Sequence, residues 1–352
     1  MDLDSKNKKW RFFGLVIVAL LSGLFVFYGN YITTEKDVET QAFYVESGMG
    51  VSEIAYKLKG VGLIKSKSLF TAVAVLLGKQ DVLMAGPYNL SKSMNISDII
   101  IKMHSGDVIK EIFTIIEGWN LRDIAWGLEN KGLFQAEELL EVVGFPAVDY
   151  NKPTDMPDMK DFSEQFSFLK EKPDNISLEG YLFPDTYQIE KDESLESILN
   201  EILKNFDKKV TVELREEIRK QKKTLFEVLT MASLLEKEVI TYKDKQIVAG
   251  ILWKREKADW PLQVDASLTY ITGEKSSELT RSDFNISSYY NTYKYKGLPI
   301  GPISNPGLDS ILAAVNYEES PYWFYLSAED GTTIFSKTLE KHDLNIEKYL
   351  NY

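Results

Sequence analysis

Apolar residues recur at helical spacing most clearly between residues 224 and 239. At about 100° per residue, one face of this segment collects Leu225, Val228, Leu229, Ala232, Leu235 and Val239. Thr224, with Glu227 three residues later, has the pattern of a capping box, in which each side chain accepts a hydrogen bond from a backbone N–H of the first turn. We therefore predict a helix that begins after Thr224 and packs its apolar face into a core.

The same helical phase separates two carboxylates near the end of this segment. Glu236 lies near the middle of the apolar face, whereas Glu238 lies on the more polar side with Glu227. An unpaired carboxylate on a buried face loses solvation of its charged form, so its pKa rises. Such a group can hold a proton near neutral pH, as the general acid of glycosidic bond cleavage must. A basic partner inside the fold, or a rotated helix that exposes Glu236, would remove this property.

Shorter periodic segments alternate along the rest of the chain. Helical spacing or a capping residue predicts helices at residues 51–58, 66–77, 96–103, 121–128, 136–143, 195–206, 243–256 and 309–315. Alternation predicts strands at residues 43–45, 85–90 and 109–116, and a hairpin of residues 322–326 and 332–335. Residues 145–175 show no clear period and are expected to be irregular. The mixture predicts an α+β fold.

Three further segments carry candidate binding chemistry. Residues 177–187 hold two acids, a glycine, a proline and three aromatic rings, which suits a sugar-lined cleft but equally a buried turn. Gln263 and Asp265 lie two apart in a segment expected to be extended, so both side chains would point to one face. They could bind hydroxyl groups or simply face solvent. Residues 286–307 are dense in Gly and Pro and predict a long, stiff loop.

The N-terminal segment has the pattern of a membrane anchor. Residues 1–11 include four basic side chains, and residues 12–32 are uncharged and mostly apolar. At ~1.5 Å per residue this stretch crosses a hydrocarbon layer of ~30 Å, and it is longer than the ~7–15 apolar residues of a cleavable signal peptide. We expect a cytoplasmic tail at 1–11, a transmembrane helix at 12–32, and a single-pass protein of the cell (inner) membrane with its bulk extracytoplasmic.

Composition excludes several classes of function. The net charge of −12 argues against a nucleic-acid partner, because phosphate binding needs a basic surface. The chain has no cysteine, so it forms no disulfide and performs no thiolate chemistry. With only His104 and His342, a histidine-rich metal site is excluded, and His342 is interpreted as structural. No cofactor motif is present, and we expect neither a cofactor nor a metal.

Seven segments, in order, resemble the endolytic murein transglycosylases of the MltG/YceG-like family. They are LEGYLFPDTY (178–187), ASLLEKE (232–238), LQVD (262–265), YNTY (290–293), GLPIGP (297–302), NPG (305–307) and residues 335–342. The chain departs from the usual pattern at Ile300, where a second proline is common, and at Val264. Neither position touches the expected chemistry. The resemblance covers residues 43–350.

The resemblance implies three parts and one catalytic residue. After a single-pass anchor come a LysM-like module at 43–108 and a catalytic domain at 109–352 that cuts peptidoglycan strands internally. For the small module, a spacer and a glycan-binding function stay equal alternatives. In the family the first Glu of the ASLLEKE segment is the catalytic acid, which corresponds to Glu236 of this chain. Penicillin-binding proteins or other wall synthases are implied as partners.

We therefore predict a lytic transglycosylase that uses Glu236 first as acid and then as base, and leaves 1,6-anhydromuramic acid ends. The residues expected to line the cleft are Gln263, Asp265, Asn291, Tyr293, Glu179 and Tyr181. One alternative is a non-catalytic, membrane-anchored protein that binds peptidoglycan or acts as a scaffold. Another is a hydrolytic muramidase with a second acid such as Asp265 or Glu179.

Overall fold

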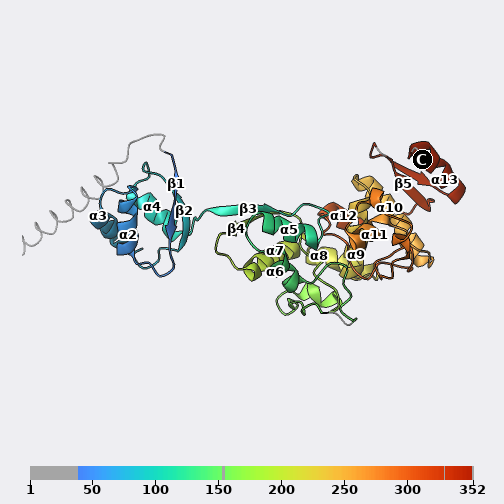
Figure 1. The fold of residues 1–352 in the computed structure, drawn as a ribbon, viewed down its shortest axis with the longest axis horizontal. Helices are drawn as coiled ribbons and strands as arrows, with labels where there is room; N and C mark the ends of the chain where they lie inside the picture. Colours follow the sequence, from blue (N-terminus) through green and yellow to red (C-terminus); the bar gives the residue numbers. More distant parts are fainter. Residues whose placement is uncertain (1–38, 153–154, 329, 351–352) are drawn as a thin grey trace, which may run out of the picture. The chain divides into compact units, whose positions relative to one another are not determined.

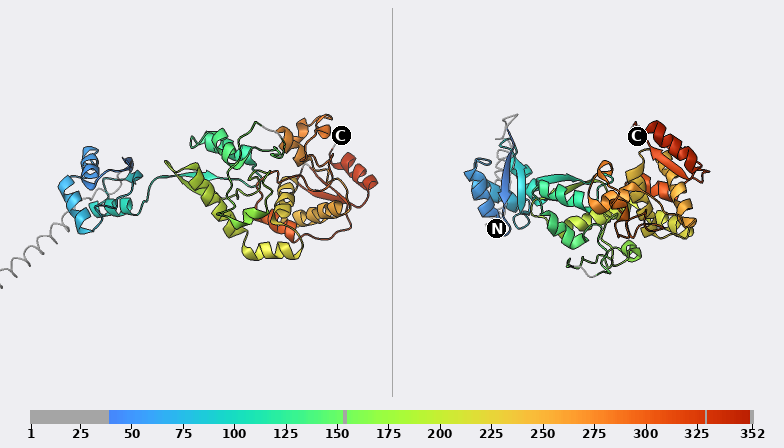
Figure 2. Two further views of the ribbon diagram at one scale, coloured as in Figure 1. Left: turned by 90° about the horizontal axis from the view of Figure 1, so that it is seen from below. Right: turned by 45° about the vertical axis from the view of Figure 1, so that its right-hand side comes forward.

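The computed structural model describes residues 39–152, 155–328 and 330–350 of the 352-residue chain. It divides into two compact units (Figures 1 and 2): unit 1 runs to Glu111 and includes residues 188–193, and unit 2 holds residues 112–187 and those from Ser194 onward. The predicted cytoplasmic tail and transmembrane helix, residues 1–32, lie outside the described residues. Within the described ranges, no helix combines the length and apolar character needed to cross a bilayer.

Unit 1 is a small α+β unit. Its elements are β1 (Gln41–Val45), α2 (Val51–Gly60), α3 (Lys67–Leu76), β2 (Gly86–Leu90) and α4 (Ile96–His104). The two strands pair antiparallel, with Phe43 opposite Tyr88. Alternate strand residues and the apolar faces of the three helices form one core, in which Ile54, Phe70 and Tyr88 are completely buried. The predicted elements of this region are confirmed. Alternation in strands and helical spacing in helices both indicate which side chains are buried in a core.

Two strands carry the chain between the units. β3 (Lys110–Thr114) and β4 (Thr186–Glu190) form a two-stranded sheet of their own. Both strands begin in one unit and end in the other, so the boundary after Glu111 falls inside β3.

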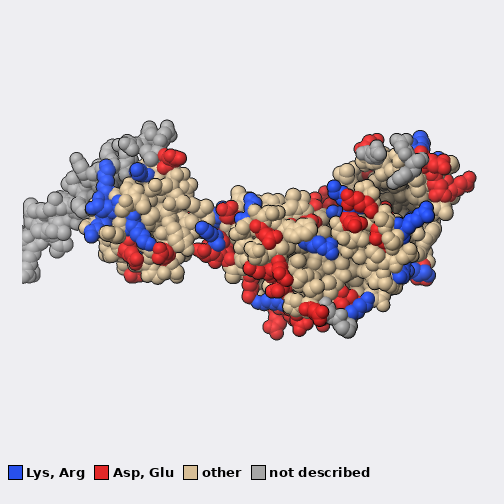
Figure 3. All heavy atoms as spheres, viewed as in Figure 1, with Lys and Arg blue, Asp and Glu red and all other residues tan. Residues whose placement is uncertain are grey.

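Unit 2 is mostly helical. Its helices are α5 (Leu121–Asn130), α6 (Ala136–Val143), α7 (Leu195–Lys209), α8 (Val212–Lys220), α9 (Leu225–Glu238), α10 (Tyr242–Lys257), α11 (Asp265–Thr272), α12 (Leu308–Val315) and α13 (Leu339–Tyr349). Short 3₁₀ turns are η1 (Ser167–Glu171), η2 (Ser276–Glu278) and η3 (Asp283–Asn285). β5 (Phe324–Ser327) and β6 (Thr333–Ser336) form the predicted antiparallel hairpin. Acidic side chains are spread over the face of unit 2 seen in Figure 3, in keeping with the net charge.

Helix α9 runs through the core of unit 2, with α10, α11 and α12 packed around it (Figure 1). Its start is confirmed: the N–H of Glu227 donates to Thr224 Oγ1 at 3.1 Å, and the N–H of Thr224 donates to Glu227 Oε2 at 2.7 Å. Every residue of α9 from 228 to 235 is buried, including Thr230 and Ser233. The helix is therefore covered on all sides, not only on the predicted apolar face.

Several local predictions fail, and strand β4 is one of the elements absent from the prediction. Residues 263–265 are not extended, because Gln263 has φ = +55° and Asp265 already begins α11. Helices α8 and α13 are absent from the prediction. Both are rich in charged residues and hold few apolar ones, and α8 buries only Arg215 and Ile218, so the segments look like solvated charged stretches.

Candidate active site

Glu236 is largely shielded from solvent, but it is not unpaired. Its side chain is 9% exposed, and Oε1 lies 3.0 Å from Nζ of Lys245, which is 6% exposed and belongs to α10. Oε2 accepts hydrogen bonds from the N–H of Gly307 at 2.9 Å and from Ser310 Oγ at 2.6 Å. The expected free acid at this position is therefore wrong. The apolar period of α9 correctly indicates that Glu236 points inward. It gives no information about Lys245, which belongs to α10 and pairs with Glu236.

The contacts of Glu236 fasten a distant segment to α9. Gly307 ends the Gly- and Pro-rich loop, and Ser310 lies in the first turn of α12. A Cβ on Gly307 would lie 2.0 Å from Oε1 of Glu117, so only glycine lets that second carboxylate approach. Burial and the charge of Glu236 raise the pKa of Glu117, and Lys245 opposes the rise. Glu236, Lys245 and the more exposed Glu117 form a charged cluster around Gly307, and its contacts position the loop.

Glu238 has a different environment at the C-terminal end of α9. Tyr325, on β5, donates its hydroxyl to Glu238 Oε2 at 3.0 Å. Burial raises the pKa of Glu238 to about 7; the Tyr325 hydrogen bond and the more distant charge of Arg255 lower it, and the negative charge of Asp265 raises it. An acid with this pKa is about half protonated at pH 7. Glu238 can therefore both give and accept a proton near neutrality.

Arg255 lies near Glu238 without forming an ion pair with it. Its guanidinium is buried and donates to backbone carbonyls: Nη1 to Leu262 at 2.6 Å, and Nε and Nη2 to Trp323 at 2.9 and 2.6 Å. The same group lies 5.7 Å from the centre of the Trp260 ring. Because these acceptors hold the guanidinium in place, Arg255 acts on Glu238 only through its field and ties α10 to the segments before α11 and β5.

Three predicted binding residues meet around the first turn of α11. The hydroxyl of Tyr293 donates to Asp265 Oδ1, and the N–H of Gln263 donates to the carbonyl of Thr292 at 3.1 Å. Gln263 and Asp265 are exposed, and Tyr293 is half-buried. Asp265 also acts electrostatically on Glu238. Two exposed polar side chains therefore lie beside an acid that is poised for proton transfer.

Asn291 supports this arrangement from inside the fold. It is completely buried, and its Nδ2 donates to the carbonyls of Phe284 and Ile286 at 3.1 and 3.0 Å. Its Oδ1 accepts the N–H of Tyr293 at 3.0 Å. Asn291 therefore holds the loop that carries Tyr293, and its burial argues against the predicted contact with a sugar.

Glu179 and Tyr181 are also completely buried. Glu179 accepts hydrogen bonds from the N–H of Leu121 at 3.1 Å, Tyr270 Oη at 3.0 Å and Asn305 Nδ2 at 2.9 Å. Burial raises the pKa of Glu179 to about 8, although the bonds from Leu121 and Tyr270 oppose this. These two residues join the core, as the buried-turn alternative for residues 177–187 describes, and do not line a surface.

His342 packs against an aromatic ring. Its imidazole is stacked 5.2 Å from the Phe324 ring, and burial lowers its pKa. This contact agrees with a structural residue. In the part of the chain that the structure describes, no three His, Cys, Asp or Glu side chains are grouped as a metal site requires.

Sequence reasoning missed four residues of these clusters: Lys245, Arg255, Tyr325 and Glu238. A signal existed only for Glu238, which is the second acid of the ASLLEKE segment. The other three lie in periodic segments whose pattern predicts a helix or strand but not a partner.

Comparison with known proteins identifies the family. The sequence profile of the YceG-like family matches residues 43–348. The endolytic murein transglycosylase of Bacillus subtilis (strain 168) is 32% identical over 348 residues, covering 94% of this chain and 91% of the relative. That of Streptococcus pneumoniae (strain ATCC BAA-255 / R6) is 30% identical over 359 residues, covering 96% of this chain and 64% of the relative. The 2.6 Å crystal structure of a yceG-like protein from Listeria monocytogenes has a TM-score of 0.57 and 32% identity, covering 87% of this chain and 98% of that one. The chain therefore belongs to the YceG-like family.

Proposed function

We propose that this protein is a lytic transglycosylase that cuts peptidoglycan strands internally, the activity for which its B. subtilis and S. pneumoniae relatives are named. One observation carries the proposal: Glu238, an acid whose pKa burial raises to about 7, lies beside the exposed polar side chains of the α11 start. A single acid of this kind suffices when the nucleophile belongs to the substrate.

The reaction divides into two proton transfers by one group. Protonated Glu238 donates to the oxygen that links N-acetylmuramic acid to N-acetylglucosamine, and the bond from muramic C1 to that oxygen breaks. The resulting carboxylate accepts the proton of the muramic 6-hydroxyl, whose oxygen bonds to C1. The enzyme ends in its starting protonation state, no water is consumed, and the product carries a 1,6-anhydro end. A pKa near the working pH suits both halves.

Glu238 is preferred to Glu236 for this role because of their partners. Glu236 pairs with the ammonium of Lys245 and also accepts hydrogen bonds from Gly307 and Ser310. Glu238 accepts from the Tyr325 hydroxyl and from the backbone N–H of Ala266, and neither donor carries a charge. In place of the predicted catalytic role, we propose that Glu236 positions the loop that ends at Gly307.

Gln263, Asp265 and Tyr293 are proposed to bind sugar hydroxyls. Gln263 adopts a left-handed backbone conformation that costs a non-glycine residue roughly 1 kcal/mol or more. The hydrogen bond from its N–H to Thr292 holds this conformation. Strained backbone conformations of this kind cluster at active sites and ligand-binding loops. Gln263 is exposed and lies two residues before Asp265, so its amide is available to a ligand.

The exposed carboxylate of Asp265 near Glu238 keeps the hydrolytic muramidase as a second candidate. Cleavage of purified glycan strands in ¹⁸O-water separates the two. A transglycosylase yields anhydromuramyl ends without label, whereas a muramidase yields reducing ends that carry ¹⁸O at C1. Loss of anhydro ends in Glu238→Gln, with the protein still folded, supports the proposed acid; full activity of that variant excludes it.

Membrane attachment, the small module and the protein partners are proposed from the sequence. Residues 12–32 would anchor the protein in the cell membrane, with residues 1–11 cytoplasmic and the bulk outside. Unit 1 would serve as a LysM-like module, and penicillin-binding proteins or other wall synthases would be neighbours. Labelling of an engineered cysteine in unit 1 of intact cells by a membrane-impermeant reagent tests the orientation.

A further inference from the structure

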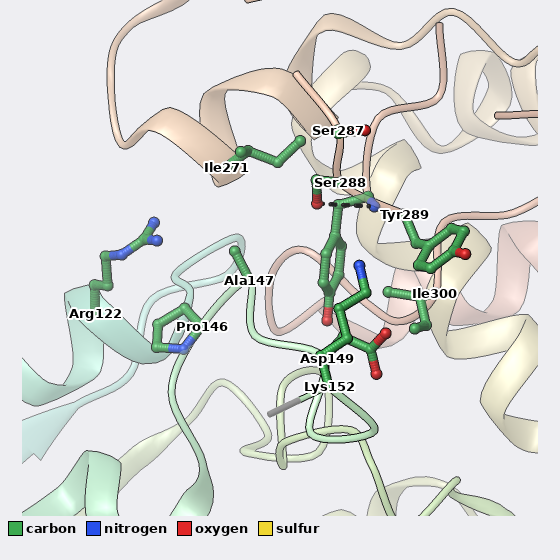
Figure 4. A pocket seen from close by; sticks show the side chains of 11 residues that line it. Arg122, Pro146, Ala147, Asp149, Lys152, Ile271, Ser287, Ser288, Tyr289 and Ile300 are labelled. Carbon is green, nitrogen blue, oxygen red and sulfur yellow. Dashed lines mark hydrogen bonds between the residues drawn. The ribbon is translucent and has the colours of Figure 1, made fainter. Parts of the chain in front are cut away.

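Unit 2 contains a pocket of about 370 Å³ that the proposed chemistry does not use (Figure 4). Arg122, from α5, forms one side, and the loop that includes Asp149 and Lys152 forms another. Ser287 and Ser288 approach from the opposite loop, as Figure 4 shows. The pocket therefore joins elements that are far apart in the sequence and has polar groups on several sides.

The two cations of the pocket are placed by specific contacts. Arg122 Nη1 donates to the carbonyl of Tyr270 at 2.8 Å, and its guanidinium lies 5.6 Å from the centre of the Tyr270 ring. Lys152 Nζ lies 4.6 Å from the centre of the Tyr289 ring. Within the described residues, no ion pair joins either cation to a carboxylate. Both charges are available to an anionic ligand.

The carboxylate that lines the pocket is already hydrogen-bonded. Asp149 Oδ1 accepts from Asn175 Nδ2 at 3.0 Å and from the N–H of Asn151 at 3.1 Å. With two cations and one acid, the lining keeps a net positive charge. Pro146, Ile271 and Ile300 add apolar surface. The chemistry fits a short chain that carries a carboxylate, hydrogen-bonding amides and small apolar groups, which describes an acidic peptide.

Two segments connect the pocket to the Glu238 site. Helix α11 begins at Asp265 and has Ile271 at the pocket, and six residues of helix span about 9 Å. Tyr290 lines the pocket, and Tyr293, three residues later, bonds to Asp265. A substrate group bound in the pocket would therefore lie about 9 Å, the length of six helical residues, from the first turn of α11.

We propose, resting on the function proposed above, that this pocket binds the acidic stem peptide carried by muramic acid on the strand being cut. Arg122 and Lys152 pair with a peptide carboxylate, and Ser287 and Ser288 bond to peptide amides. The apolar wall receives the methyl groups of alanine. The enzyme would thereby prefer strands that still carry peptides.

A binding measurement tests the pocket without requiring catalysis. The full-length Glu238→Gln protein is titrated by calorimetry with a synthetic L-Ala-γ-D-Glu-L-Lys-D-Ala-D-Ala peptide. Lys152→Glu, at an exposed position, should weaken binding about tenfold or more, because a charge-assisted contact becomes a repulsion. Lys131→Glu, an equal charge change on the exposed end of α5 outside the pocket, should leave the affinity unchanged. Amidation of the peptide carboxylates should abolish the difference between the two variants. Absence of binding, or equal affinity of Lys152→Glu and Lys131→Glu for the free acid, would overturn the proposal.

A cleavage measurement then separates this proposal from the proposed function. Wild-type protein should release anhydro ends faster from peptide-bearing strands than from strands stripped by an amidase, and Lys152→Glu should lose that preference while cutting stripped strands normally. Equal rates of wild type on both substrates would overturn the pocket and leave the transglycosylase standing. If neither substrate is cut, the proposed function is wrong. The peptide titration then decides by itself whether the pocket binds the stem peptide.

Discussion

Glu236 and Lys245 form an ion pair of 3.0 Å inside unit 2, between neighbouring helices α9 and α10. This pair ties the first acid of the ASLLEKE segment to helix α10. It leaves Glu238, two residues later, as the acid of this segment whose pKa burial raises to about 7. The assignment of chemistry within the segment follows from that difference in partners.

Replacement of Glu238 by Gln should reduce the rate of anhydro-end formation by a factor of about 10²–10⁴, the usual contribution of a general acid or base. The variant should fold normally, because Gln can still accept the Tyr325 hydrogen bond. Mass spectrometry of digested glycan strands measures the rate, and circular dichroism checks the fold. If Glu236→Gln instead abolishes the reaction in a folded protein while Glu238→Gln does not, the two roles are exchanged.

The pH profile of kcat/KM should fall as pH rises through about 7, because the proton that Glu238 donates is then lost. The Tyr325 hydrogen bond lowers this pKa, so Tyr325→Phe should move the fall to higher pH. The charge of Asp265 raises the pKa, so Asp265→Asn should move the fall to lower pH. The position of the inflection is the readout, since both changes also alter the rate. Shifts of the same sign in the two variants would contradict the assignment.

Breaking the Glu236–Lys245 ion pair should lower the free energy of unfolding. Glu236→Gln leaves Lys245 as an uncompensated buried cation, and the free energy of unfolding should fall by roughly 3–5 kcal/mol. The single change Lys245→Met should be similarly costly. The double variant Glu236→Gln/Lys245→Met should recover much of this loss, because no charge is then stranded. Denaturant unfolding of the four proteins completes the cycle, and strictly additive losses would mean that the pair contributes nothing.

Glu179 should make the fold less stable as pH rises. Its pKa is about 8 in the folded protein and 4.5 in a free side chain, so the folded state holds this proton more tightly than the unfolded state. The resulting stabilisation is complete below about pH 4.5 and is lost as pH rises through about 8, amounting to roughly 5 kcal/mol. In Glu179→Gln this part of the pH dependence should vanish. The exposed Glu164→Gln serves as control and should keep it; an unchanged dependence in Glu179→Gln would refute burial of this carboxyl as the cause.

Much of the local structure followed from the sequence, with α9 as the clearest case. The capping box marked its start, and the apolar period identified it as a core helix. The period placed Glu236 on the apolar face and Glu238 on the polar side, but in the structure both are partly buried, and burial raises the pKa of Glu238. The period could not say which of them would keep a proton, because helical phase gives the direction of a side chain and not the charge of what it meets.

The predicted binding residues also divide into some that the structure places at the surface and others that it buries. The family resemblance grouped Gln263, Asp265 and Tyr293, which the structure brings together around the first turn of α11. It grouped Asn291 and Glu179 with them, although both are completely buried. A polar residue in a motif can bind substrate or satisfy buried backbone groups, and only its burial distinguishes the two.

By itself, therefore, the sequence determined the helices with strong periods, the acidic and cysteine-free character of the chain, and the segments in which the chemistry lies. The tertiary structure decided how the two acids are partnered. Lys245 and Ser310 reach Glu236, and Tyr325 reaches Glu238, from 9 to 87 residues away along the chain. Proton affinity depends on burial and on neighbouring charges, and both are properties of the packed fold and not of any one segment.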